Sequence, residues 1–224
     1  MGANILIVGK SGTGKSRSII NLNPSETFVI NVNRKDMPFR GWRSKYTEWN
    51  KENLNGNLLN SDSHDTILKT IRYIDEKRPE IKVGIIDDFQ YTMANEFMRR
   101  AKEKGFEKFT EIGEHAWKLI WECNLCRSSL VWVILSHSDE NEHGEQKCKT
   151  IGKLLDDKIC IEGMFTIVLN TSVERLDEKS EYFFETQNNG RNTSKSPEGM
   201  FETQKIPNDL KFVIDSIHSY EKGE

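Results

Sequence analysis

Short apolar runs separated by polar, helix-like stretches are the main pattern of this chain. Each run is almost continuously apolar rather than alternating, which is typical of strands covered on both faces of a sheet. We therefore predict buried, mostly parallel strands over these runs. They lie at residues 4–8, 27–32, 83–87, 130–135 and 165–169.

Helical patterns occupy the intervals between the runs. Strands that alternate with helices predict an α/β fold with a doubly wound, mostly parallel sheet and helices on both faces. The predicted helices lie at residues 16–22, 63–77, 91–104 and 109–126. Two later apolar runs, at 182–186 and 212–214, are expected to be additional strands, the first of them in a β-hairpin.

Length and composition fit one soluble globular domain. The chain has 224 residues, of which 36% are hydrophobic and 30% charged, and we predict a single domain over 1–219 with a frayed tail at 220–224. No stretch approaches the length of a membrane span, and the first apolar run leads into a glycine-rich loop rather than a signal-peptide cleavage site. We expect a cytoplasmic protein.

The charge balance narrows the ways in which the chain could bind nucleic acid. A net charge of −3 excludes a globally basic surface, so any contact with DNA requires a local patch or one assembled by oligomerisation.

The most specific motif is the octapeptide Gly-Lys-Ser-Gly-Thr-Gly-Lys-Ser at residues 9–16. It matches the phosphate-binding P-loop (Walker A) pattern G-x-x-x-x-G-K-[ST] at every fixed position, between a predicted strand and a predicted helix. Lys15 is expected to reach the β- and γ-phosphates of ATP, and the Ser16 hydroxyl to bind Mg²⁺. The residues expected to contact the nucleotide are Gly9, Lys10, Ser11, Gly12, Thr13, Gly14, Lys15, Ser16 and Arg17.

A second motif ends the strand predicted at residues 83–87. Its apolar residues run into Asp87-Asp88, the Walker B pattern, and we expect Asp87 to hold Mg²⁺ opposite Ser16. Asp88 is a candidate for orienting the attacking water, with Asp36 as a competitor for that role. The alternative for Asp88 is a helix N-cap.

His137 follows the strand predicted at residues 130–135. In a parallel sheet the tip of that strand lies beside the tip that carries Asp87, so His137 is a candidate sensor of the γ-phosphate. The alternative is a partly buried histidine whose ring is satisfied by the backbone.

Two polar segments carry candidate functional cations. Residues 139–163 have a helical middle, and they form either a DNA-facing loop hinged on the sensor strand or a solvated surface. Residues 186–197 form a turn-rich loop that either supplies a cation to a neighbouring subunit or is plain surface. The DNA-contact candidates are Lys147, Lys149, Lys153 and Lys158, and the candidates for acting in trans are Arg191 and Lys195.

Two further features leave alternatives open. Residues 33–60 carry several aromatic residues among basic ones, and these either stack on bases or pack a small subdomain. Cys123 and Cys126 have the spacing of half a zinc site, but no second closely spaced pair follows. This favours free thiols on a helix in a reducing compartment.

Taken together, these motifs resemble the RecA-like P-loop ATPases encoded by bacteriophages, a group that includes single-strand-annealing recombination ATPases. The resemblance rests on residues 9–16, 85–90, 135–137, 150–158 and 187–197. It implies a RecA-type core, ATP with Mg²⁺, assembly into a ring or filament, and work on single-stranded DNA. It also implies a bacterial host cell and a possible phage single-strand-binding protein as partner.

Two departures from that group concern hydrolysis. RecA proteins place a catalytic glutamate just after the strand that follows the P-loop, where this chain reads Asn31-Val32-Asn33. They also place a glutamine where this chain has His137. The missing glutamate keeps a second function open, that of a nucleotide-dependent adaptor or loader that turns over little ATP. The length of the chain and its P-loop also leave a small-molecule or nucleotide kinase as an alternative.

Overall fold

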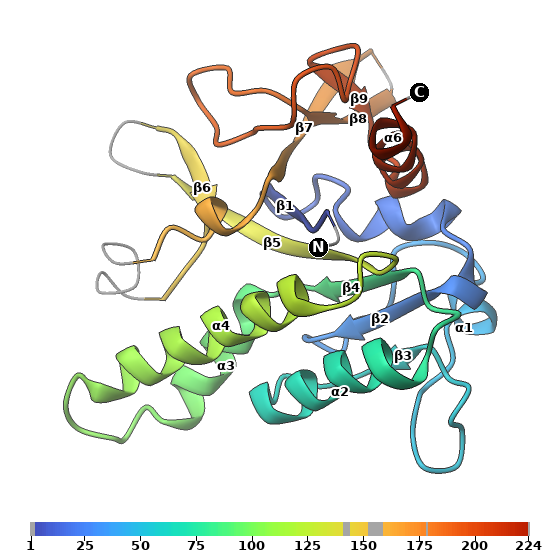
Figure 1. The fold of residues 1–224 in the computed structure, drawn as a ribbon. Coiled ribbons are helices and arrows are strands. Elements are labelled where there is room, and N and C mark those ends of the chain that lie inside the picture. Colours follow the sequence, from blue (N-terminus) through green and yellow to red (C-terminus); the bar gives the residue numbers. More distant parts are fainter. Residues whose placement is uncertain (1–2, 141–143, 152–158, 178, 224) are drawn as a thin grey trace.

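The structure is a computed structural model, and it describes residues 3–140, 144–151, 159–177 and 179–223. Within these ranges the chain forms one sheet flanked by helices (Figure 1). The strands are β1 (Ile5–Gly9), β2 (Thr27–Asn31), β3 (Leu58–Leu59), β4 (Val83–Asp87), β5 (Val131–Glu140), β6 (Gln146–Cys148), β7 (Ile167–Leu176), β8 (Lys179–Glu185) and β9 (Lys205–Pro207). The α-helices are α1 (Trp42–Lys45), α2 (His64–Lys77), α3 (Gln90–Arg99), α4 (Glu107–Leu125) and α6 (Leu210–Lys222). Short 3₁₀ helices η1, η2 and η3 cover Ser16–Asn21, Pro24–Glu26 and Glu162–Met164.

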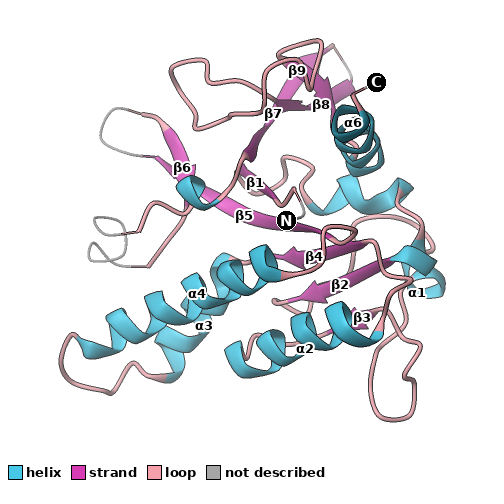
Figure 2. Ribbon diagram, in the orientation of Figure 1, coloured by secondary structure: helices cyan, strands magenta, loops and turns pink. Residues whose placement is uncertain are grey.

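The strand order confirms the predicted doubly wound sheet. In the described residues the order is β3-β2-β4-β5-β1-β7-β8-β9, with β6 paired to β5 outside this path. Strands β3 to β7 along this order are parallel, whereas β8 and β9 add antiparallel strands at one edge (Figure 2). The predicted late hairpin is therefore present as β7 and β8. Because β5 lies between β4 and β1, the end of β5 separates the Walker B tip from the P-loop.

Alternate side chains of the central strands face two separate cores. In β1, Leu6 and Val8 belong to the core beneath α2, α3 and α4. Ile5 and Ile7 belong to the core on the opposite face, which includes residues of α6 and η1. All four side chains are fully buried, because successive side chains of a strand point to opposite faces and here both faces are covered.

The helices confirm most of the predicted boundaries. Ser63 precedes α2 as its N-cap, and α4 begins two residues before the predicted start. Helix α3 ends at Arg99, earlier than predicted, and the predicted helix after the P-loop is the 3₁₀ helix η1.

Two predictions near the ends of elements are wrong. Residues 212–214 are not a strand but part of α6, whose buried side chains Leu210, Val213, Ile214 and Ile217 follow helical spacing. Helix α6 continues through Lys222 into the segment predicted as a tail, and Gly223 caps it in a left-handed conformation. Strand β5 does not end near His137 but continues to Glu140, because its last residues pair with β6.

The aromatic segment of residues 33–60 packs against the core. Phe39 and Tyr46 are buried. Trp49 contacts Phe28 edge-on, with ring centroids 5.9 Å apart. This favours the packing interpretation over base stacking for these side chains.

The cysteines at the end of α4 are buried thiols. Cys123 lies in the helix and Cys126 is its C-cap residue, as the interpretation without zinc predicts. Burial raises the pKa of the Cys126 thiol to about 12. Among the described residues, no helix is long and apolar enough to cross a membrane.

Candidate functional site

The P-loop connects the end of β1 to η1 and is held by contacts with β7. Gly12 and Gly14 have positive φ angles of 77° and 93°, which glycine adopts without steric cost. At Gly9 the backbone passes so close to β7 that an added Cβ would lie 1.7 Å from Thr171 Oγ1. The Thr13 and Thr171 hydroxyls form a hydrogen bond of 2.6 Å, which anchors the loop to β7.

Lys15 is buried beneath this loop. Its ammonium donates hydrogen bonds to the carbonyl oxygens of Gly9 and Lys10, at 2.7 and 2.8 Å. Burial lowers the pKa of Lys15 to about 8, although the nearby carboxylates of Asp88 and Asp87 oppose the shift. A cation held in this way is available to anionic oxygens that enter the loop.

Ser16 and Asp87 meet across the site as the sequence predicts. The Ser16 hydroxyl donates a hydrogen bond of 2.9 Å to Asp87 Oδ1, over 71 residues of sequence separation. Burial, together with the adjacent Asp88 carboxylate, raises the pKa of the Asp87 carboxyl to about 6. A buried carboxylate beside a hydroxyl is a set of hard oxygen donors, so these two residues fit a divalent cation such as Mg²⁺.

Asp88 is buried between two basic side chains. Its carboxylate forms an ion pair with Lys35, and His137 Nε2 lies 3.4 Å from Asp88 Oδ1. Burial acts to raise the pKa of Asp88, but the contacts with His137 and Lys35 outweigh it and lower the pKa. Asp88 also has a positive φ of 63°, an uncommon conformation for a residue other than glycine.

The position of His137 agrees with the predicted strand arrangement. His137 is directly opposite Gly9 in the parallel pairing of β5 with β1, so it lies between the P-loop and Asp88. Its backbone N–H donates a 3.1 Å hydrogen bond to the buried side chain of Gln90, the first residue of α3. Strand β5 is therefore tied to the segment that follows Asp88.

Sequence reasoning missed Lys35 as a site residue. Lys35 lies beyond the end of β2, in a turn held by hydrogen bonds between the Asn31 side chain and the Lys35 backbone. The Asn31 side-chain amide donates to the Lys35 carbonyl at 2.7 Å and accepts from its N–H at 3.2 Å. The only available signal was its position after β2, because no motif places a lysine there.

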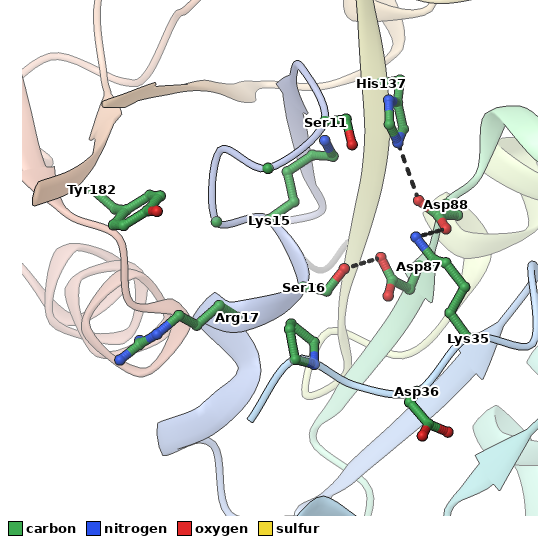
Figure 3. A pocket seen from close by; sticks show the side chains of 13 residues that line it. Ser11, Lys15, Ser16, Arg17, Lys35, Asp36, Asp87, Asp88, His137 and Tyr182 are labelled. Carbon is green, nitrogen blue, oxygen red and sulfur yellow. Dashed lines mark hydrogen bonds and ion pairs between the residues drawn. The ribbon is translucent and has the colours of Figure 1, made fainter. Parts of the chain in front are cut away.

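These groups line a single cavity of about 300 Å³ (Figure 3). In the figure, His137, Asp88 and Lys35 lie at one end, whereas Arg17 and Tyr182 lie at the other. Asp36, the competitor of Asp88, lines the cavity but forms an exposed ion pair with Arg43. The lining residues are Ser11, Gly12, Gly14, Lys15, Ser16, Arg17, Lys35, Asp36, Pro38, Asp87, Asp88, His137 and Tyr182.

Not every predicted nucleotide contact has its side chain in this cavity. Lys10 forms a 2.5 Å ion pair with Glu140. Lys10 and Thr13 line a neighbouring cavity of about 320 Å³ between the P-loop, β7 and the loop of residues 186–197. Their backbone, rather than their side chains, remains the predicted phosphate contact.

The candidates for acting in trans lie away from the first cavity. Arg191 is exposed and lines the neighbouring cavity. Lys195 is half-buried, and its backbone exchanges two hydrogen bonds with Val168 of β7. Neither residue is among those that line the cavity of Lys15 and Asp87.

Two of the DNA-contact candidates are placed by the structure. Lys147 lies in β6, which pairs with the end of β5. The Lys149 N–H donates a 2.8 Å hydrogen bond to the carbonyl oxygen of His137, which connects this segment to the candidate sensor. Lys153 and Lys158, and with them the predicted helical middle of the segment, lie outside the described residues.

Comparison with known proteins supports the class of fold. No known protein-family profile and no curated protein sequence matches the chain. Among solved structures, the chain is similar to a KaiC-like protein from the hyperthermophilic archaeon Pyrococcus horikoshii. That likeness has a TM-score of 0.54 at 14% sequence identity, and covers 92% of this chain and 85% of the other. With the strand order and the P-loop, it shows the predicted RecA-like P-loop NTPase fold.

Proposed function

We propose that this protein binds ATP with Mg²⁺ and hydrolyses it. The observation that carries the proposal is the Ser16–Asp87 hydrogen bond beside the buried ammonium of Lys15, inside one cavity. P-loop NTPases use these residue types to hold the metal ion and the β- and γ-phosphates. The RecA-like fold also implies a nucleotide ligand.

Each residue of the cavity has a role in this proposal. Lys15 and the loop amides bind the phosphates, while Ser16 and Asp87 hold Mg²⁺. When bound, Mg²⁺ neutralises charge on the phosphate oxygens. Asp88 positions the attacking water, and His137 contacts the γ-phosphate from the sensor strand.

We further propose that the ATPase acts on single-stranded DNA, in phage recombination, annealing or replication within a bacterial host. The support is the hydrogen bond between Lys149 and His137, which offers a direct route from a basic segment to the nucleotide site. The protein would act as a homo-oligomer, with a neighbour's Arg191 or Lys195 completing the site and a phage single-strand-binding protein as a candidate partner.

One observation favours a second function, that of a nucleotide-dependent adaptor. Asp88, the candidate for positioning water, is engaged by both Lys35 and His137. Asn31 lies opposite Asp87 in the pairing of β2 with β4. RecA proteins carry a catalytic glutamate just after this strand, and this chain has no glutamate there. Binding without efficient turnover is consistent with this arrangement.

The test is nucleotide binding and hydrolysis with and without single-stranded DNA, across a salt series. We expect ATP turnover that DNA stimulates and that salt suppresses steeply, because phosphate contacts release counterions. Binding with negligible turnover would favour the adaptor. Transfer of phosphate to a nucleoside monophosphate would indicate a kinase.

Lys15→Ala is the matched test of the site itself. It removes the buried phosphate-binding cation, so we expect ATP binding to be lost. The control is Lys69→Ala, which removes an exposed lysine from α2 and should leave binding unchanged. Equal ATP affinity in wild type and Lys15→Ala would contradict the assignment of the P-loop.

A further inference from the structure

Lys35 pairs with the buried carboxylate of Asp88, the candidate for positioning the attacking water. Its ammonium pairs with Asp88, whose side chain is only 2% exposed, whereas the Lys35 side chain is 48% exposed. The carboxylate is thus fixed inside the cavity, and the lysine reaches it from the rim. A long, partly exposed lysine can exchange partners without any change in the fold.

The backbone aims Lys35 into the cavity. Asn31, the last residue of β2, bonds both the N–H and the carbonyl oxygen of Lys35. Arg34 between them has a left-handed φ of 53°, so the chain turns sharply before Lys35. This geometry lets the end of the Lys35 side chain reach the carboxylate of Asp88, next to Asp87 (Figure 3).

In the empty cavity the positive charges of Lys15 and Lys35 balance the negative charges of Asp87 and Asp88. Lys15 and Lys35 both face the carboxylates of Asp87 and Asp88, and each ammonium acts on Asp87. A nucleoside triphosphate brings several negative charges to this balance. Of the described lysines and arginines that line the cavity, Lys35 pairs with Asp88, whereas Lys15 belongs to the loop and Arg17 lies at the far end.

We propose that Lys35 is a second phosphate-binding cation, which pairs with Asp88 in the empty cavity and moves to the terminal phosphate of a bound nucleoside triphosphate. This inference rests on the proposed function and adds a residue to it. The exchange would release Asp88 to hold water only when the terminal phosphate is present. Lys35 would therefore make the cavity distinguish a triphosphate from a diphosphate.

The test compares the affinity of Lys35→Met for a non-hydrolysable ATP analogue and for ADP, each with Mg²⁺. Methionine keeps the aliphatic stem and removes the charge. We expect the affinity for the ATP analogue to fall about tenfold, which corresponds to about 1.4 kcal/mol. Affinity for ADP should change less than about twofold, because ADP lacks the terminal phosphate. Lys35→Arg should preserve the preference for the triphosphate.

The matched control is Arg40→Met, which removes one positive charge from the same segment. Arg40 is exposed and does not line the cavity, so both affinities should remain as in wild type. A Lys35→Met protein that keeps the wild-type preference for the triphosphate, or loses both affinities equally, would overturn the role of Lys35. A wild-type protein that binds neither nucleotide would overturn the proposed function as well.

Discussion

Asp87 and Asp88 are adjacent in sequence, yet their carboxyls have opposite electrostatic environments. Asp87 is buried against a hydroxyl, and burial raises its pKa to about 6. Asp88 is equally buried but paired with Lys35 and His137, which together lower its pKa. Ionised Asp87 is therefore the costly charge in the empty cavity, and a divalent cation would relieve that cost.

Removing the charge of Asp87 should stabilise the empty protein at neutral pH. Because the folded pKa of about 6 lies above the ordinary value of 3.8, the buried Asp87 carboxyl costs stability that builds up as pH rises from about 3.8 and is complete above about 6. Asp87→Asn should therefore be more stable than wild type by about 2 to 3 kcal/mol near pH 7.5 without Mg²⁺. The difference should disappear as pH falls toward about 4.

Thermal or urea unfolding at several pH values measures this difference. Mg²⁺ should stabilise the wild type and leave Asp87→Asn unaffected. A variant less stable than wild type at neutral pH would contradict the environment assigned to Asp87.

Replacing Asp88 separates binding from turnover. Asp88→Asn keeps the size of the side chain but cannot accept a proton from water, so turnover should fall at least about 100-fold. Affinity for the ATP analogue should stay within about threefold of wild type, since Asp88 is not expected to hold the phosphates. Steady-state hydrolysis and calorimetry check the two parts, and unchanged turnover would transfer the role to another group such as Asp36.

Among the elements, β7 supports the P-loop most closely. An added Cβ at Gly9 would meet Thr171 Oγ1 at 1.7 Å, a distance that only displacement of the loop or the strand could relieve. Gly9→Ala should therefore destabilise the protein by about 1 to 3 kcal/mol. Thr171→Ala in the same chain should recover part of the loss, because it removes the clashing hydroxyl. Strictly additive effects of the two substitutions on unfolding would show that this contact is not the cause.

Continuous apolar runs predicted the central strands, because strands covered on both faces need no polar positions. The short strands β3 and β6 lack such a run and form only by pairing with longer neighbours. The run at residues 212–214 suggested a strand, although Asp209 caps a helix there and apolar residues recur at helical spacing. That helical spacing is visible in the sequence and correctly predicts a helix in this region.

The site residues, too, divide into those that a sequence pattern marks and those that no pattern marks. Ser16, Asp87 and His137 were predictable because a motif or a strand end marks each of them, and parallel strands bring their ends to one edge. Lys35 and Tyr182 reach the cavity from a loop after β2 and from β8, where no motif exists. Their contribution depends on backbone turns and on the hairpin, which sequence patterns do not specify.

For the whole molecule, the proposed homo-oligomer makes Arg191 the better candidate for completing a neighbour's site. Arg191 is exposed and does not line the cavity of Lys15 and Asp87 in its own chain, whereas the backbone of Lys195 is hydrogen-bonded to β7. Arg191→Ala should therefore lower turnover about tenfold or more while nucleotide affinity is kept.

Mixing variants tests whether Arg191 acts between subunits. In a mixture of Arg191→Ala and Lys15→Ala proteins, an intact P-loop in one subunit can meet an intact Arg191 in the next. Turnover of the mixture should exceed that of either variant alone. If the mixture is no more active than the sum of its parts, Arg191 does not act in trans.

The most direct measurement is a crystal structure of the protein with Mg²⁺ and a non-hydrolysable ATP analogue. We predict that the phosphates lie against the loop of residues 9–16 and that the metal ion lies between Ser16 and Asp87, which already meet in this structure. An analogue bound elsewhere, or a metal ion away from Asp87, would contradict the account.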